Sequence, residues 1–270
     1  MTKTPPRGGR FPASLNEAAS KASQPQATLR PQRTLNEAAR DQRLLAVPTG
    51  LGLDSATVRQ RMVERLRADG ARCEPALQAM ASVSRHLFVD TALATQAYED
   101  TSLPIGLGQT ISKPSVVARM IEWLYLGDGS RQRGHLGRVM EIGTGCGYQA
   151  AVLAQLSSHV LSIERLKPLH ELAARHLRAQ HVPRTQLFYG DGMLGYAPRA
   201  PYDSIIAAAG GDDIPQAWLD QLAVGGRLVA PATAADGQGQ VLVVVDRFPD
   251  GLRRTLGEVV QFVPLKSGIK

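Results

Sequence analysis

The chain has 270 residues, of which 43% are hydrophobic, so it can bury a full core in one large domain or in one domain with an extension. Two cysteines, Cys73 and Cys146, exclude a disulfide framework and a thiolate metal cage, and the six histidines are scattered without metal-ligand spacing. No apolar run approaches the roughly 18 residues of a membrane span, and no secretory signal is recognisable. We therefore expect a cytoplasmic protein with no metal and no membrane partner.

The net charge of +7 is concentrated at the start of the chain. Residues 1–47 contain eight basic and three acidic residues, so they carry +5 and leave the remainder near neutral. Their richness in Pro, Gln, Ser, Arg and Ala predicts a disordered basic tail over 1–47, followed by a folded domain over 48–270. A near-neutral body argues against a nucleic-acid partner. Within the tail, residues 14–19 recur as residues 34–39, which fits either short partner-binding helices or a chance duplication.

The first part of the folded domain, residues 48–125, is predicted to be mostly helical. Val58, Met62, Val63 and Leu66 recur at helical spacing and predict a helix that ends near Gly70. Further helices are expected from residue 75 and over residues 115–124. Between them, residues 97–114 contain several glycines and are predicted to be irregular, and residues 127–137 are predicted to form a loop.

The most informative motif is the segment EIGTGCG at residues 141–147, which follows a short apolar run. A strand that ends in a tight glycine turn, with a helix after it, lets the backbone approach a ligand closely. The dinucleotide fingerprint would require its third glycine where this chain has Tyr148. Glu141 would repel a pyrophosphate but suits a cationic ligand, so the motif favours S-adenosylmethionine over a dinucleotide. The alternative is a turn in which the glycines serve geometry alone.

Two further acidic residues follow predicted strands. Glu164 ends the run at residues 159–164, about 20 positions after the glycines, where an acid commonly holds ribose hydroxyls. Asp191, followed by Gly192, stands after the apolar run at residues 186–188, within expected reach of an adenine amino group. Each acid alone could instead be a helix cap or a turn residue. Three acids at three successive strand ends favour a cofactor site.

Strands and helices alternate through the predicted core, residues 138–270. Residues 202–207 predict a strand that is buried on both faces, residues 215–222 a helix, and residues 227–230 another strand. Two final runs, residues 240–245 and 259–263, flank a turn at residues 249–251 and predict an antiparallel pair at one sheet edge. This order predicts a doubly wound α/β fold whose ligands bind at the carboxyl ends of the strands.

Over most of residues 55–265 the sequence resembles the protein-L-isoaspartate (D-aspartate) O-methyltransferases. The resemblance depends on four segments: YED at 98–100, GQTIS at 108–112, the glycine turn at 141–148, and FVPL at 262–265. It implies a seven-stranded, Rossmann-like methyltransferase sheet with N-terminal helices that cover the site and an antiparallel C-terminal edge. It also implies S-adenosylmethionine as methyl donor, and damaged proteins or peptides with L-isoaspartyl residues as acceptors. Methylation of the free α-carboxylate would lead to repair through a succinimide.

The same resemblance assigns roles to individual residues. Ser112 matches the family's active-site serine, and Thr110 lies beside it. The implied cofactor site comprises Glu141, Gly143, Thr144, Gly145, Gly147, Glu164, Asp191 and Gly192. Residues 207–213 (AAAGGDD) depart from the family pattern close to the expected site of methyl transfer.

The expected chemistry requires alignment of the reactants and no general base. A carboxylate is already ionised at neutral pH, so a lone serine that donates one hydrogen bond to it is sufficient. Ser112 could alternatively be a helix N-cap ahead of Pro114, and one hydroxyl proton cannot serve both acceptors at once. Two other functions stay open at this point: a nucleic-acid methyltransferase that captures its substrate with the basic tail, and a cofactor-binding module without turnover.

Overall fold

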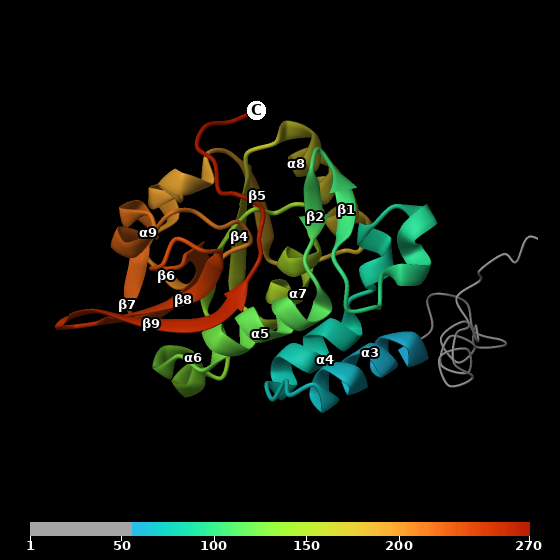
Figure 1. Ribbon diagram of the computed structural model, residues 1–270, viewed down its shortest axis with the longest axis horizontal. Coiled ribbons are helices and arrows are strands. Elements are labelled where there is room, and N and C mark those ends of the chain that lie inside the picture. The colour runs from blue at the N-terminus through green and yellow to red at the C-terminus, as the bar shows by residue number, and fades with distance from the viewer. Residues whose placement is uncertain (1–55) are drawn as a thin grey trace, which may run out of the picture. The chain divides into compact units, whose positions relative to one another are not determined.

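The computed structural model describes residues 56–270, so the predicted tail over 1–47 and its repeat lie outside the described residues. A seven-stranded sheet has the order β5-β4-β3-β6-β7-β8-β9 (Figure 1). The strands β3 to β7 are parallel to one another, β8 is antiparallel to β7, and β9 is antiparallel to β8. The strands are β3 (Arg138–Ile142), β4 (His159–Glu164), β5 (Thr185–Tyr189), β6 (Tyr202–Ala207), β7 (Leu222–Thr233), β8 (Gln240–Phe248) and β9 (Gly251–Val260). The predicted α/β class and the antiparallel edge are confirmed.

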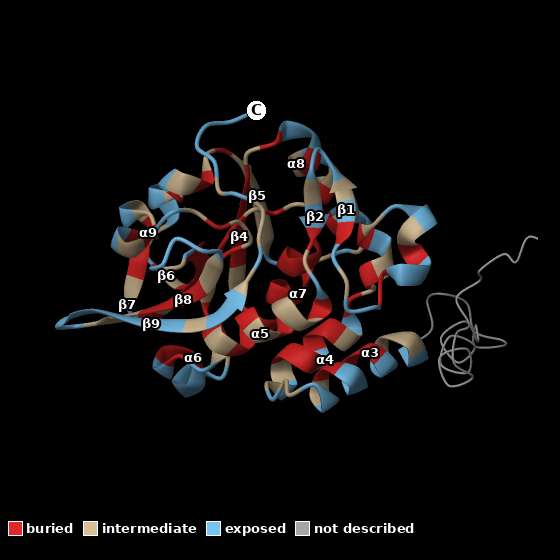
Figure 2. Cartoon of the chain, in the orientation of Figure 1, coloured by how far each residue is buried: buried red, intermediate tan, exposed pale blue. Residues whose placement is uncertain are grey.

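Helices cover both faces of the sheet because its strands are apolar on both sides. On β3, Val139 packs with the N-terminal helices and α7, whereas the adjacent Met140 packs on the other face with Trp218 of α9. Figure 2 shows the buried residues along the sheet and on the inward faces of α4, α5 and α7, while β9 is largely exposed. The α-helices are α3 (Ala56–Ala68), α4 (Glu74–Ser82), α5 (Pro114–Tyr125), α6 (Asp128–Arg133), α7 (Tyr148–Leu156), α8 (Lys167–Ala179) and α9 (Gln216–Gln221).

Several predicted boundaries need correction. The stretch predicted to be irregular contains an antiparallel hairpin, β1 (Leu103–Gly106) and β2 (Gln109–Ile111), and the predicted loop at 127–137 contains α6. The strand β7 starts at Leu222, directly after α9, rather than at residue 227. The second strand of the edge pair, predicted at residues 259–263, is β9 and starts at Gly251, because the tight turn pairs Phe248 with Gly251. It ends at Val260, and residues 261–263 lie beyond it.

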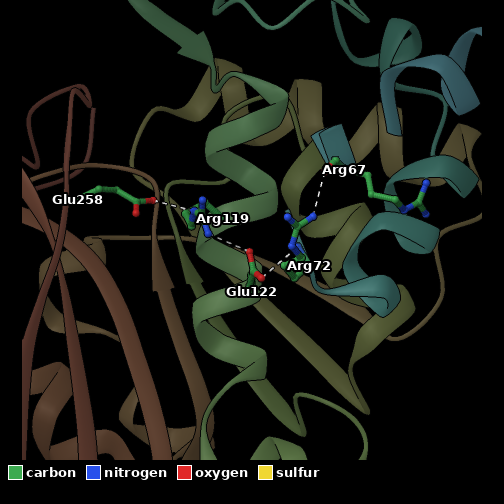
Figure 3. Close-up of polar contacts among 5 residues, drawn as sticks. All are labelled: Arg67, Arg72, Arg119, Glu122 and Glu258. Atoms are coloured by element: carbon green, nitrogen blue, oxygen red, sulfur yellow. Dashed lines mark hydrogen bonds and ion pairs between the residues drawn. The ribbon is translucent and has the colours of Figure 1, made fainter. Parts of the chain in front are cut away.

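A polar network holds α5 in place between the turn after α3 and the strand β9 (Figure 3). The carboxylate of Glu122, a buried residue of α5, accepts hydrogen bonds from the backbone N–H of Arg72 and from the guanidinium of Arg119. Arg119 also forms an ion pair of 3.2 Å with Glu258 on β9. Because α5 begins two residues after Ser112, this network helps to fix the position of that residue.

Two of the scattered histidines, His170 and His176, are half-buried on α8. The Nδ1 atom of His176 hydrogen-bonds with the carbonyl of Cys146 at 2.9 Å, and its ring packs edge-on against Phe88. Within residues 56–270, no cluster of His, Cys, Asp and Glu side chains could hold a metal ion. None of the helices over the same residues combines the length and the apolar character needed to cross a membrane.

Candidate active site

A cavity of about 360 Å³ lies at the carboxyl ends of the parallel strands, the position expected for a ligand in an open α/β sheet. Four parts of the chain meet there: the hairpin β1–β2 with Ser112, the glycine loop after β3, the end of β4, and the segment that follows β9. The lining includes Ile105, Thr110, Ser112, Gly143, Thr144, Gly145, Glu164, Leu166, Gly192, Val263 and Leu265. Segments from both halves of the domain therefore share one pocket.

The glycine loop adopts a backbone that only glycine takes up without strain. Gly143, Gly145 and Gly147 have φ values of 88°, 56° and 92°. A Cβ atom at Gly145 would also lie 3.1 Å from the side chain of Ile105 on β1. At Gly147, where α7 begins, it would lie 3.3 Å from Leu177 of α8. Gly145 and Gly147 thus serve two purposes, because each adopts a backbone conformation that favours glycine and each lets a neighbouring side chain pack closely.

Glu164, at the end of β4, ties the glycine loop to the next strand. One carboxylate oxygen accepts a hydrogen bond from the backbone N–H of Gly145, and the other accepts one from Leu166, each at 2.9 Å. The side chain is buried and borders the cavity. Carboxylates that accept backbone N–H bonds make strong, charge-assisted contacts, so Glu164 stabilises the loop as well as presenting a polar group to the cavity.

Glu141 lies beneath the glycine loop rather than on the cavity wall. Its carboxyl accepts a hydrogen bond from Ser162, whose hydroxyl is 2.6 Å from that of Thr144. Burial raises the pKa of Glu141 to about 8, against the opposing influence of the polar neighbours Ser162 and Gln149. At neutral pH this carboxyl is therefore mostly uncharged. Glu141 is not among the residues that line the cavity, so the structure places its carboxyl behind the loop that a ligand would meet.

Asp191 follows β5 but is directed to backbone groups. One carboxylate oxygen accepts a hydrogen bond from Met193 at 2.9 Å, and the other accepts one from Gly268 at 2.6 Å. The segment that carries Gly268 runs from the end of β9 across the strand ends towards α8 (Figure 1), and the backbones of Lys167 and Lys270 are hydrogen-bonded. Gly192 lines the cavity, whereas Asp191 anchors this last segment.

Ser112 stands at the opposite wall, between β2 and α5. Its hydroxyl makes no hydrogen bond within residues 56–270, and α5 begins at Pro114 with no side-chain cap from Ser112. Asp100 accepts hydrogen bonds from both the backbone N–H and the hydroxyl of Ser115 in the first turn, at 2.8 and 2.7 Å. Asp100 thus caps the first turn of α5, the role that the N-cap alternative gave to Ser112. The hydroxyl of Ser112 is therefore available to a ligand.

The structure brings seven of the ten predicted site residues to the cavity. They are Thr110, Ser112, Gly143, Thr144, Gly145, Glu164 and Gly192, whereas Glu141, Gly147 and Asp191 lie behind it. Ala208 and Ala209, from the segment that departs from the family pattern, line the cavity as well.

Gln149 and Arg85 are two polar residues near the cavity that the sequence did not reveal. Gln149 lines it, and the amide nitrogen of this buried side chain has no partner within residues 56–270. Arg85 is fully buried behind Ser112 and donates to the Ser112 carbonyl at 2.7 Å. Neither residue belongs to a motif with a fixed spacing. A charged residue in the apolar stretch around Phe88 was the only available signal for Arg85.

Comparison with known proteins agrees with this geometry. The model of the family "Protein-L-isoaspartate(D-aspartate) O-methyltransferase (PCMT)" matches residues 55–270. A protein-L-isoaspartate O-methyltransferase of Methylibium petroleiphilum is 61% identical over 241 residues, which cover 89% of this chain and 88% of the relative. The corresponding protein of Leptothrix cholodnii is 59% identical and covers 98% of this chain and 96% of the relative.

Solved structures extend the comparison to the fold. A protein-L-isoaspartate O-methyltransferase superposes with a TM-score of 0.68 at 26% identity, over 77% of this chain and 66% of the other. A putative Plasmodium falciparum relative, solved in complex with S-adenosyl-L-homocysteine, gives 0.65 at 21% identity, over 77% of this chain and 98% of the other. With the family model matching four-fifths of its length, the chain belongs to the protein-L-isoaspartate (D-aspartate) O-methyltransferase family.

Proposed function

We propose that the cavity binds S-adenosylmethionine against the glycine loop and presents its methyl group to an L-isoaspartyl carboxylate held at Ser112. The product is the methyl ester of the free α-carboxylate, the first step in repair of a damaged protein or peptide. The observation that carries the proposal is that the glycine loop, Glu164 and Ser112, whose hydroxyl has no partner in the described part of the chain, line one cavity.

The donor side of the cavity fits the cofactor. The loop from Gly143 to Gly145 lies open to the cavity in a conformation that allows close approach of a ligand. The orphaned amide nitrogen of Gln149 is a buried hydrogen-bond donor that requires a partner, which a polar ligand in the cavity would supply. Glu164 is the acidic residue at the strand end where a ribose would be held. Glu141 and Gly147 support the loop from behind.

The acceptor side is formed by the hairpin and the start of α5. The Ser112 hydroxyl donates a hydrogen bond to one oxygen of the substrate carboxylate and so leaves the other oxygen free to attack. Thr110, an exposed residue of β2 close to Ser112, forms part of the cavity rim that a peptide would contact. Among the described residues the cavity lining contains no histidine, and an ionised carboxylate requires no base to remove a proton.

When bound, the cofactor supplies an electrophilic methyl group, which the carboxylate oxygen takes while the carbon–sulfur electron pair stays on sulfur. The chain's own contribution is alignment. Holding two reactants in line can be worth about 7–11 kcal/mol in favourable cases. The apolar residues Ile105, Val117 and Leu265 of the lining limit water around the carboxylate, which weakens its hydration and increases its reactivity.

Two peptides that differ only in one linkage test this function. We expect labelled methyl groups to be transferred to a peptide with one L-isoaspartyl residue and not to its normal aspartyl twin. Equal labelling of both peptides would exclude isoaspartyl recognition. Cofactor binding without labelling of either would indicate a binding module, and activity on RNA or DNA that is lost with residues 1–47 would indicate a nucleic-acid methyltransferase.

A further inference from the structure

Arg85 is a buried cation that has no ion-pair partner. Its side chain is 0% exposed, and among residues 56–270 no carboxylate lies within 4 Å of it. One nitrogen, Nη1, has no hydrogen-bond partner within the same described residues. Burial lowers the pKa of Arg85, but a guanidinium stays protonated in proteins. An unpaired buried charge costs free energy, so its presence here requires an explanation.

The guanidinium connects the acceptor wall to the glycine loop. Its Nε atom donates to the carbonyl of Ala97, and Nη2 donates to the carbonyl of Ser112, each at 2.7 Å. Its central carbon lies 4.7 Å from the ring centre of Tyr148, the first residue of α7. Both Ser112 and Tyr148 line the cavity. The positive charge is therefore bonded to the backbone of the residue that carries the Ser112 hydroxyl, and it is shielded from water.

The two carbonyls do not need a charge, since a neutral donor such as a glutamine amide would satisfy them. The ring of Tyr148 attracts the cation, but one such contact offsets only part of the cost of burying it. The cost is recovered if an anion binds nearby, because opposite charges attract strongly where water is excluded. On the proposed function, the ligand at Ser112 is a carboxylate.

We propose that Arg85 is a positioning residue that selects an anionic acceptor: its buried charge favours a carboxylate at Ser112 over a neutral group of the same shape. This inference rests on the proposed function of the cavity. Arg85 acts through the Ser112 backbone and through its electric field, and it does not touch the substrate.

A comparison of two peptide ligands separates charge selection from simple support of the fold. One peptide carries an isoaspartyl residue, and the other carries the isoasparaginyl analogue, in which a neutral carboxamide replaces the free α-carboxylate. Both are labelled with a fluorophore and titrated by anisotropy against the full chain saturated with S-adenosylhomocysteine. The measured quantity is the ratio of the two dissociation constants, which a general loss of packing would leave unchanged.

We expect Arg85→Gln to weaken binding of the isoaspartyl peptide by about tenfold or more and to leave the neutral analogue within about twofold. Arg85→Lys should retain most of the preference for the carboxylate, because it keeps a positive charge although it loses the two-carbonyl bridge. The matched control is Arg65→Gln. Arg65 also donates to a backbone carbonyl, that of Tyr98, and its loss should not change the ratio.

The inference is overturned if Arg85→Gln weakens the binding of both peptides equally or of neither. It is also overturned if Arg85→Lys no longer prefers the isoaspartyl peptide to its neutral analogue. If Arg85→Gln fails to bind cofactor or to show a cooperative thermal transition, the test passes to Arg85→Met, whose flexible apolar side chain suits a buried site, and to Arg85→Lys. Failure of the wild-type chain to methylate the isoaspartyl peptide would instead count against the proposed function. The two failures are therefore distinguishable.

Discussion

The two walls of the cavity are built in different ways. The donor wall consists of β3, the glycine loop and the end of β4, which are consecutive in the chain and bonded to each other through Glu164 and Gly145. The acceptor wall gathers more widely separated segments around Ser112: Arg85 donates to its carbonyl from 27 positions away, and Glu122 bonds the helix α5 to Arg72, 50 positions away. The geometry of the donor wall therefore depends mainly on its own sequence, whereas that of the acceptor wall depends on how the N-terminal part of the domain packs.

The largest effect is expected at the donor wall. Replacing Glu164 by Ala removes the acceptor for two backbone N–H groups and the proposed ribose contact. Each charge-assisted bond contributes about 1.5–3 kcal/mol, so we expect cofactor affinity in equilibrium dialysis to fall by roughly 100-fold or more. Glu171→Ala, at an exposed position of α8, is the control and should bind normally. A loss smaller than about threefold for Glu164→Ala would show that the loop holds its shape without this carboxylate.

The next effect distinguishes the walls from each other. Ser112→Ala should reduce kcat/KM for an isoaspartyl peptide by about 10- to 100-fold, the value of one hydrogen bond to a charged group. Cofactor affinity should remain within about twofold, because the donor wall is intact. Ser102→Ala, an exposed serine outside the cavity, serves as the control. Equal losses of cofactor affinity and of turnover would mean that Ser112 supports the pocket as a whole.

Glu141 provides a pH test of the donor wall. Its pKa is raised from 4.5 to about 8 in the folded protein, so between these values the unfolded chain ionises this group while the folded chain keeps it protonated. The folded state then binds more protons, and this group lowers stability as the pH rises through that window, by at most about 1.4 kcal/mol per pH unit. Below pH 4.5 both states are protonated and the contribution is constant.

Glu141→Gln removes this titrating group, so the variant should lose less unfolding free energy than the wild type when the pH rises from 5 to 8. Urea unfolding at several pH values measures it. Glu171→Gln should follow the wild type. A parallel pH profile for Glu141→Gln and wild type would mean that Glu141 is ionised in the folded protein.

The smallest effect tests how the acceptor wall depends on distant support. Asp100→Ala removes the acceptor at the start of α5 and should lower stability by about 1 kcal/mol. It should also reduce kcat/KM a few-fold, because the start of α5 sets the position of Ser112. Asp90 caps a separate short helix by accepting from Ala92, so Asp90→Ala should lower stability without a change in kcat/KM. Identical activity in the two variants would refute this coupling.

The sequence predicted the donor wall well because its signals are local. The glycines at 143, 145 and 147 and the acid at the end of β4 lie at fixed distances along the chain, so spacing alone places them together. The strands β3 to β6 were predictable for the same reason, because a buried parallel strand is a short apolar run between turn signals. Boundaries were less accurate where pairing partners decide them, as in β7 and in the hairpin of β8 and β9.

Ionisation and orientation could not be predicted from the sequence. Glu141 and Glu164 are both acids at strand ends, but burial makes the first mostly neutral, while the second bonds the glycine loop beside the cavity. Asp191 is bonded to Gly268, which is 77 positions away. The ionisation of Glu141 depends on desolvation, and the bonding of Asp191 depends on which distant backbone groups lie beside it. Residue spacing along the chain predicts neither.

The sequence by itself therefore determined the fold class and the position of the glycine loop, because periodicity and glycine spacing act over a few residues, while its resemblance to known motifs indicated the family. Only the tertiary structure decided that Asp100 caps α5, that no group in residues 56–270 bonds the Ser112 hydroxyl, and that Arg85 lies behind it as a buried cation. Such contacts arise when segments far apart in the chain exclude water from the same volume.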